Sequence, residues 1–290
     1  MSKYDHLIGK EVAQGTWSWN QDKVMLYAVG VGVGTDDASR ELHFATENLP
    51  GKPLQVIPTF PALMGVRGDW IEALGLATKD GMTVGLVHGE EGVTLHRPIP
   101  VEGSVRLSKV IKGVYDKGSG MLIQFETAIT LEGSGEPLAT VEMRLFALGF
   151  GGFGGPRNPP EDRPWELPAR APDHQVSYSV GRNQSLIYRL SGDHHPHGTQ
   201  HARAQLDGFE RPILYGLGSY GFTCRALLQA LTDSEAAPFR HMHARFSKPV
   251  YPGDRLDIRI WETGDGGAIF QTLANGERIV LDRGVFRYDG

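Results

Sequence analysis

Apolar and polar side chains alternate along four stretches of the chain, two in each half. The alternation covers Val105 to Leu107 and Met121 to Ile129 in the first half, and Leu256 to Trp261 and Ile279 to Phe286 in the second. A period of two places successive side chains on opposite faces of a strand. The pattern therefore predicts antiparallel strands with one covered face in both halves.

A different spacing, with apolar residues at three- and four-residue steps, runs from Pro212 to Leu231. This spacing predicts a helix, and apolar residues on most of its faces indicate that a sheet wraps around it. The corresponding candidate in the first half, Met64 to Leu76, is weaker because Gly65 and Gly68 interrupt it. Few helices among many strands predict an α+β protein.

The chain reads as two related halves joined by a segment rich in proline and glycine. Two prolines shortly precede Gly103 in the first half, and two prolines likewise precede Gly253 in the second. A predicted strand follows each glycine. Residues 151–172 contain too much proline and glycine for the interior of a helix or strand. We therefore expect a first domain over 1–150, a linker over 151–172 and a second domain over 173–290.

Charge and composition exclude several classes of protein. The 290 residues include 29 Lys and Arg against 34 Asp and Glu, a net charge of −5, which argues against nucleic-acid binding. The single cysteine, Cys224, excludes an intramolecular disulfide. No window approaches the ~20 apolar residues of a membrane span, and Gly30 to Gly34 lacks the Gly-x-Gly-x-x-Gly spacing of a dinucleotide site. We expect a cytoplasmic protein that binds neither nucleic acid nor membranes.

Polar side chains gather in one segment of the second half, Ser191-Gly192-Asp193-His194-His195-Pro196-His197-Gly198. The motif Gly208-Phe209-Glu210-Arg211-Pro212-Ile213-Leu214-Tyr215-Gly216 follows it and leads into the predicted helix. With Val87-His88-Gly89-Glu90 and Gly151-Gly152-Phe153-Gly154-Gly155 in the first half, these motifs resemble those of the enoyl-CoA hydratase 2, or MaoC-like dehydratase, family. The resemblance covers most of the chain. It implies a double hot-dog fold, in which two antiparallel sheets, each wrapped around a long helix, are joined side by side and the first repeat binds the acyl chain.

The resemblance also implies an activity, the addition of water to a trans-2-enoyl thioester to give the (R)-3-hydroxyacyl product, or the reverse reaction. It implies that Asp193 is the catalytic carboxylate and that the N–H of Gly216 stabilises the thioester oxyanion. The family has asparagine two residues after this aspartate and a catalytic histidine five residues after it, where this chain has His195 and Gly198. We therefore expect His195 or His197 to supply the imidazole. If neither does, Gly198→His should raise hydration, and if one does, this change should have little effect.

Two other functions stay open: an intramolecular conjugate addition in which a substrate hydroxyl replaces water, and thioester binding without catalysis. Tyr188, Tyr215 and Arg211 are the expected substrate-binding residues, with Tyr188 along the acyl chain and Arg211 on coenzyme A phosphates. The substrate is an acyl thioester of coenzyme A or of a carrier protein. We expect no cofactor and no metal, because the clustered histidines lack a helical His-Glu-x-x-His pattern. A homodimer is left open.

Overall fold

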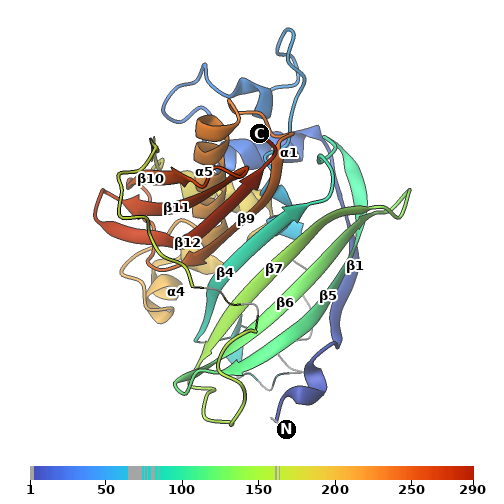
Figure 1. Ribbon diagram of the computed structural model, residues 1–290, viewed down its shortest axis with the longest axis vertical. Helices are drawn as coiled ribbons and strands as arrows, with labels where there is room; N and C mark the ends of the chain where they lie inside the picture. Colours follow the sequence, from blue (N-terminus) through green and yellow to red (C-terminus); the bar gives the residue numbers. More distant parts are fainter. Residues whose placement is uncertain are drawn as a thin grey trace.

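The computed structural model describes residues 3–64, 74, 76, 78–79, 82–83, 85–160, 162 and 164–290. Its main feature is a ten-stranded antiparallel sheet with the order β1-β5-β6-β7-β4-β9-β12-β11-β10-β8 (Figure 1). The first five strands in this order are β1 (Glu11–Trp19), β5 (Gly103–Asp116), β6 (Gly120–Leu131), β7 (Pro137–Leu148) and β4 (Leu86–Leu95). The other five are β9 (Phe239–Phe246), β12 (Arg278–Tyr288), β11 (Gly267–Ala274), β10 (Arg255–Glu262) and β8 (His174–Ser179).

The four stretches of alternating sequence lie in β5, β6, β10 and β12, so the strand predictions are confirmed. A small separate ribbon pairs β2 (Thr78–Lys79) with β3 (Met82–Thr83). The helices that the structure describes are α1 (Gln21–Gly30), α3 (Gln184–Tyr188), α4 (His201–Leu206) and α5 (Gly216–Leu231). Several 3-10 turns complete the described structure, among them Phe60–Met64 and Pro196–Gly198.

The two halves meet edge to edge rather than as separate sheets. Strand β4 pairs with β9 in antiparallel register, with Gly92 opposite His243 and Val93 opposite Met242. The expected two sheets are therefore joined into one continuous sheet of ten strands. We call this whole sheet the seam sheet, and we call the pairing of β4 with β9 the seam. Since an unpaired edge strand exposes a row of backbone donors and acceptors, this pairing protects one edge of each half.

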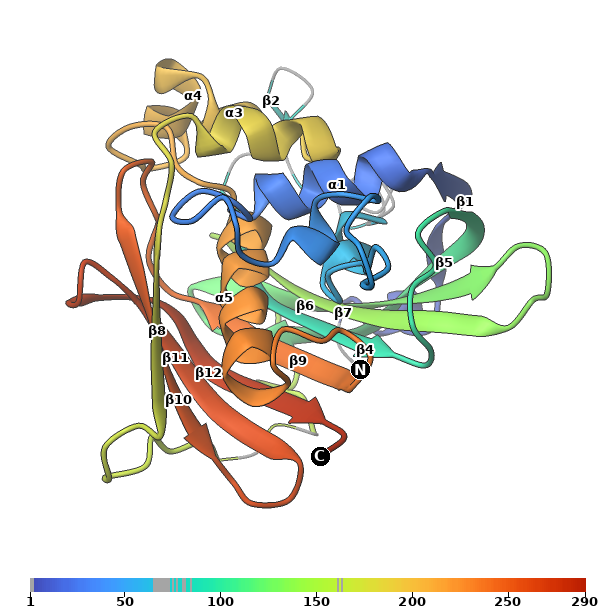
Figure 2. The same cartoon turned by 90° about the horizontal axis from the view of Figure 1, so that it is seen from above.

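Helix α5 lies on the concave face of the sheet formed by β8 to β12 (Figure 2). It is buried from Gly218 through Leu228, as its apolar sequence predicts. The helix begins at Gly216 rather than at Pro212, because Leu214 forms a β-bridge with Val250. The candidate helix from Met64 to Leu76 falls, apart from Met64, Leu74 and Leu76, outside the described residues.

Helix α1 packs across α5 at a place where only glycine fits. A Cβ atom on Gly221 would lie 2.4 Å from Cγ1 of Val31 and 3.0 Å from the Tyr27 hydroxyl. Figure 2 shows α1 and α3 lying side by side above α5. This packing brings the start of the polar segment, which follows α3, to the same end of the molecule as the N-terminus of α5.

The segment between β7 and β8 is irregular in its described part, 149–160, 162 and 164–173. It is held near β5 by Asp116, whose carboxylate accepts hydrogen bonds from the N–H groups of Gly118, Gly152 and Gly154 at 2.7–2.8 Å. The division into domains at 151–172 stays a prediction.

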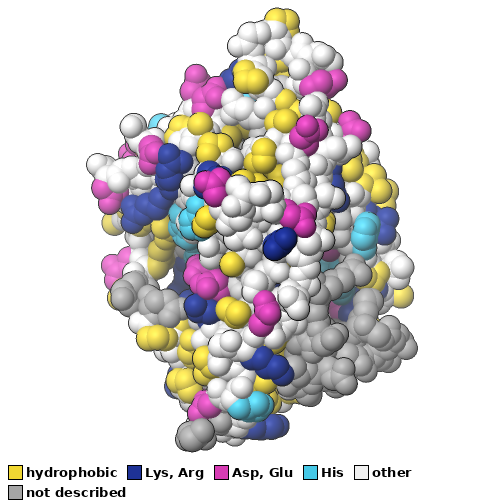
Figure 3. Space-filling model, turned by 90° about the vertical axis from the view of Figure 1, so that its right-hand side faces the viewer, with side chains coloured by type: hydrophobic (Ala, Val, Ile, Leu, Met, Phe, Trp, Pro, Cys, Tyr) yellow, Lys and Arg dark blue, Asp and Glu magenta, His cyan; other side chains and the backbone are white. Residues whose placement is uncertain are grey.

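The surface drawn in Figure 3 mixes Lys and Arg with Asp and Glu side chains, in keeping with the small net charge. Among the described residues, no helix is both long and apolar enough to cross a membrane. The cytoplasmic location expected from the sequence stays a prediction.

Candidate active site

The polar segment turns sharply after α3 and places Asp193 against the protein interior. Gly192 adopts a φ of 130°, a conformation that favours glycine. The Asp193 Oδ1 atom then accepts a hydrogen bond from the N–H of His195 at 3.3 Å. Asp193 is half-buried, and loss of solvent raises the pKa of its carboxyl group above the ordinary value, although neighbouring histidines oppose this. A carboxylate with a raised pKa is a better proton acceptor near neutral pH.

The two candidate imidazoles of this segment have Asp207 as their carboxylate neighbour. The Asp207 Oδ2 atom lies 3.7 Å from Nδ1 of His197 and 4.0 Å from Nδ1 of His195. Burial lowers the pKa of His197 to about 3 and also lowers the pKa of His195. His197 is therefore neutral at physiological pH.

His195, His197 and Asp207 bring three potential metal ligands within 4.8 Å of one another. Both carboxylate oxygens of Asp207 are already bonded to Arg203, at 2.9 Å from Nη2 to Oδ1 and 3.0 Å from Nε to Oδ2. A metal ion would have to displace this guanidinium or share the carboxylate with it. The cluster is thus organised as an ion pair flanked by two imidazoles.

Tyr215 and Gly198 are complementary in shape. The Tyr215 ring is fully buried, and its hydroxyl donates to the backbone carbonyl of His195 at 2.8 Å. A Cβ atom on Gly198 would lie 2.5 Å from this ring. The tyrosine therefore fills the space next to Gly198, so a histidine side chain there would have to displace the ring. The effect of Gly198→His on hydration stays a prediction.

The residue that caps the N-terminus of α5, Tyr215, is linked to Asp193 through His195. Tyr215 is the N-cap residue and makes no side-chain capping hydrogen bond, so the first N–H groups of the helix depend on other partners. The Asp193 charge raises the pKa of the Tyr215 hydroxyl, second to burial as a cause. At Gly216, the ring of Phe246 lies 3.2 Å from the position of a Cβ atom. A larger residue would crowd this approach to the helix N-terminus.

Tyr188 lies deeper in the same region. Its ring is buried and packs 5.5 Å from the Tyr215 ring and 6.3 Å from the Tyr27 ring. The Tyr188 hydroxyl has no hydrogen-bond partner among the described groups, and burial raises its pKa well above the ordinary value. A buried hydroxyl without a partner costs about 1–3 kcal/mol, so this one is an unmet hydrogen-bonding demand in the protein interior.

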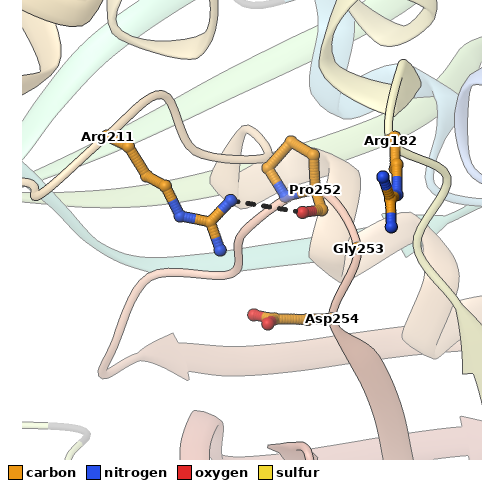
Figure 4. Close-up of a pocket in the computed structure, with 5 residues that line it drawn as sticks. All are labelled: Arg182, Arg211, Pro252, Gly253 and Asp254. Atoms are coloured by element: carbon orange, nitrogen blue, oxygen red, sulfur yellow. Dashed lines mark hydrogen bonds between the residues drawn. The ribbon is translucent and has the colours of Figure 1, made fainter.

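Arg211 lies apart from the other predicted residues, in a cavity of about 410 Å³ lined by Arg182, Arg211, Pro252, Gly253 and Asp254. Figure 4 shows Arg182 and Arg211 on either side of the Pro252–Gly253 turn. Arg211 donates a long hydrogen bond of 3.4 Å to the Pro252 carbonyl and lies over the Tyr251 ring at 4.6 Å. Asp254 forms an ion pair with Arg278. The two arginines at the cavity are suited to a phosphate group.

Sequence reasoning missed a second polar pair, which comes from the first half. His88 and Glu91 of β4 are joined by a bond of 2.9 Å between Nε2 and Oε2, and the His88 ring packs 4.7 Å from the ring of Phe246. In the sequence, the motif Val87-His88-Gly89-Glu90 indicates only the family resemblance of the first half. It does not predict the bond between His88 and Glu91, because Glu91 lies one residue beyond the motif.

Comparison with known proteins agrees with this architecture. Residues 17–149 match the family model "MFE-2 hydratase 2 N-terminal domain", and residues 165–280 match "MaoC like domain". The chain is 37% identical to 3-hydroxyacyl-thioester dehydratase Y of Mycobacterium tuberculosis, over 97% of both chains. A MaoC-like dehydratase from Phytophthora capsici superposes with a TM-score of 0.83 at 29% identity, covering 98% of this chain and 96% of the other.

A further Mycobacterium tuberculosis structure, described as a double hot-dog fold, superposes with a TM-score of 0.57 at 13% identity, covering 98% of this chain and 97% of the other. This likeness concerns the fold alone. The predicted double hot-dog fold is confirmed, with the two repeats fused into the seam sheet.

Proposed function

Because the chain belongs to the MaoC-like enoyl-CoA hydratase 2 family and is a hydratase or dehydratase, we propose that it interconverts trans-2-enoyl and (R)-3-hydroxyacyl thioesters. The observation that carries this proposal is the half-buried Asp193, which is linked to the start of α5 through His195: the Asp193 carboxylate accepts from the His195 N–H, and the His195 carbonyl accepts from Tyr215, the N-cap residue of α5. The active site is diverged, since Gly198 and Tyr215 stand where the family has histidines.

The two groups meet the two demands of hydration. Water must lose a proton as its oxygen attacks C3, and the thioester oxygen gathers negative charge until C2 is protonated. Asp193 accepts the proton from water, and burial supports this by raising the pKa of its carboxyl group. The N–H of Gly216 stabilises the oxyanion, helped by the positive end of the α5 dipole.

The remaining predicted residues fit roles in binding an acyl thioester. Tyr188 and Tyr215 form the aromatic wall next to Asp193, and the Tyr188 hydroxyl offers a donor to the substrate. Arg211, with Arg182, is suited to the phosphates of a coenzyme A or carrier-protein thioester. His195 and His197 hold the polar segment next to Asp207.

The test measures hydration of crotonyl-CoA and longer trans-2-enoyl-CoA substrates by the purified protein, with chiral analysis of the product. We expect turnover that gives the (R)-3-hydroxyacyl isomer. An (S) product would contradict the stereochemical part of the proposal. Tight thioester binding with no hydration and no dehydration would show a binding protein, and cyclisation of a hydroxylated enoyl thioester alone would show a conjugate addition.

A further inference from the structure

Hydration takes one proton from water and delivers one proton to C2 of the substrate. Asp193 alone would have to serve both atoms, so the reaction needs a second proton-transfer group. The imidazoles of His195 and His197 lie beside Asp207, and burial keeps His197 neutral. The charges of His195 and His194 also act on Asp193. The described structure brings another imidazole to the site from the opposite half of the chain.

A β-bulge places His88 and Glu91 on the same face of β4. In the pairing of β4 with β7, His88 lies opposite Leu145 and Glu90 lies opposite Arg144, so Gly89 is an extra residue. In a regular strand, residues three apart point to opposite faces. The bulge removes this difference and allows the 2.9 Å bond between the His88 imidazole and the Glu91 carboxylate.

Glu91 is a buried orienting group. Its side chain is only 2% exposed, whereas that of His88 is 27% exposed. Burial raises the pKa of Glu91, while the hydrogen bond from His88 and the charges of His88, Lys109 and His243 oppose this rise. A carboxylate bonded to Nε2 fixes the orientation of the imidazole, as in other carboxylate–imidazole pairs. The Nδ1 atom has no hydrogen-bond partner among the described residues.

His88 and Asp193 converge on the start of α5. The His88 ring packs on Phe246, and the Phe246 ring lies against Gly216. The Asp193 carboxylate accepts a hydrogen bond from the N–H of His195, and the His195 carbonyl accepts one from Tyr215, the residue before Gly216. The charge of His88 also lowers the pKa of Asp193. A carboxylate from one half and an imidazole from the other are thus both linked to the start of α5.

We propose that His88, oriented by Glu91, is the imidazole partner of Asp193 in the proton transfers of hydration. This assignment rests on the proposed hydratase function. As the water oxygen bonds to C3, the water proton passes to the Asp193 carboxylate. The C2–C3 double bond becomes a single bond, and C2 takes the proton from Nδ1 of the His88 imidazolium. A proton transfer from Asp193 to His88 then restores the starting state.

The experiment compares kcat and KM for enoyl-CoA hydration in the native protein and in His88→Ala, His88→Asn and Glu91→Gln, with folding checked by thermal unfolding. We expect the His88 variants to lose roughly 10²-fold or more in kcat with little change in KM. Added imidazole should restore part of the activity of His88→Ala, because the site is partly open. His96→Asn is the matched control, since His96 directly follows β4 and its exposed imidazole bonds only Thr140 among the described contacts. This variant should keep native activity.

Glu91→Gln separates positioning from structure. Removing the carboxylate leaves the His88 imidazole without the group that orients it, so kcat should fall with little change in KM or in melting temperature. Folded His88 variants with native kcat, or native kcat in folded Glu91→Gln, would overturn the assignment of His88 but leave the hydratase function intact. Loss of activity in His195→Ala or His197→Ala with native activity in His88→Ala would do the same. A native protein with neither hydration nor dehydration would overturn both proposals.

Discussion

At the scale of single residues, the site is governed by contacts that link positions far apart in the sequence. The ring of Tyr215 occupies the volume beside Gly198, and its hydroxyl bonds the carbonyl of His195. Neither residue can therefore change independently. The sequence shows both departures from the family motif, but only the 2.5 Å approach reveals that they are one feature.

Gly198→His alone should lower the melting temperature and leave hydration at or below the native level, because the new Cβ overlaps the Tyr215 ring. Overpacking of this kind costs about 1–3 kcal/mol. Adding Tyr215→His should relieve the overlap and bring turnover above that of Gly198→His. A double-mutant cycle on Tm and kcat measures this coupling, and additive effects of the two changes would contradict it.

Asp193→Asn keeps the shape of the side chain and removes the proton acceptor, so kcat should fall by roughly 10²-fold or more. Stability should not fall, because burial disfavours the ionised carboxylate that the change removes. Asp265→Asn, in the exposed turn between β10 and β11, serves as the control and should keep native kcat. Native turnover in Asp193→Asn would exclude Asp193 as the base.

At the scale of elements, strands were predictable and their irregularities were not. The alternation in β5, β6, β10 and β12 reflects a single covered face, which the sequence records directly. The bulge at Gly89 depends on pairing with β7, so the sequence offers no sign that His88 and Glu91 share a face. Helix α1 is not among the predicted helices; it is only ten residues long and ends at Gly30, where the glycine-rich stretch to Gly34 begins.

The crossing of α1 and α5 should be sensitive to one methyl group. Gly221→Ala places a Cβ 2.4 Å from Val31, and we expect a loss of about 1–3 kcal/mol in the free energy of unfolding. Gly15→Ala in β1 is the control, because no atom among the described residues lies within 4 Å of its Cβ position. Urea unfolding measures both. Equal stability of the two variants would show that α1 moves to accommodate the methyl group.

The glycine segment after β7 should detach in acid. Hydrogen bonds from Gly152, Gly118 and Gly154 lower the pKa of Asp116 to about 2, below its ordinary value of 3.8. A depressed pKa in the folded state gives stability that is present above the unfolded value and lost as the pH falls towards 2. The difference in urea midpoint between native protein and Asp116→Asn should therefore be largest above about pH 5. A constant difference down to pH 3 would contradict this role.

At the scale of the whole molecule, the seam between β4 and β9 decides how the halves work together. The sequence predicts a repeat but not the edge through which the repeats join, because both strands could equally have remained outer edges. Pairing of Gly92 with His243 and of Val93 with Met242 makes the sheet continuous. It also brings His88 of one repeat to Phe246 and Gly216 of the other.

Because of this seam, the protein could be divided into two fragments whose association is measured by enzyme turnover. If the chain is cut in the exposed stretch around Arg157, β4 becomes an unpaired edge strand of one fragment and β9 an unpaired edge strand of the other. Each fragment also holds part of the proton-transfer machinery. Either fragment alone should show no turnover. Mixing the two fragments should restore turnover at a rate that depends on their concentration. Turnover then becomes a direct measure of association, so that mutations along β4 and β9 can be ranked by the concentration of partner fragment at which half of the signal returns.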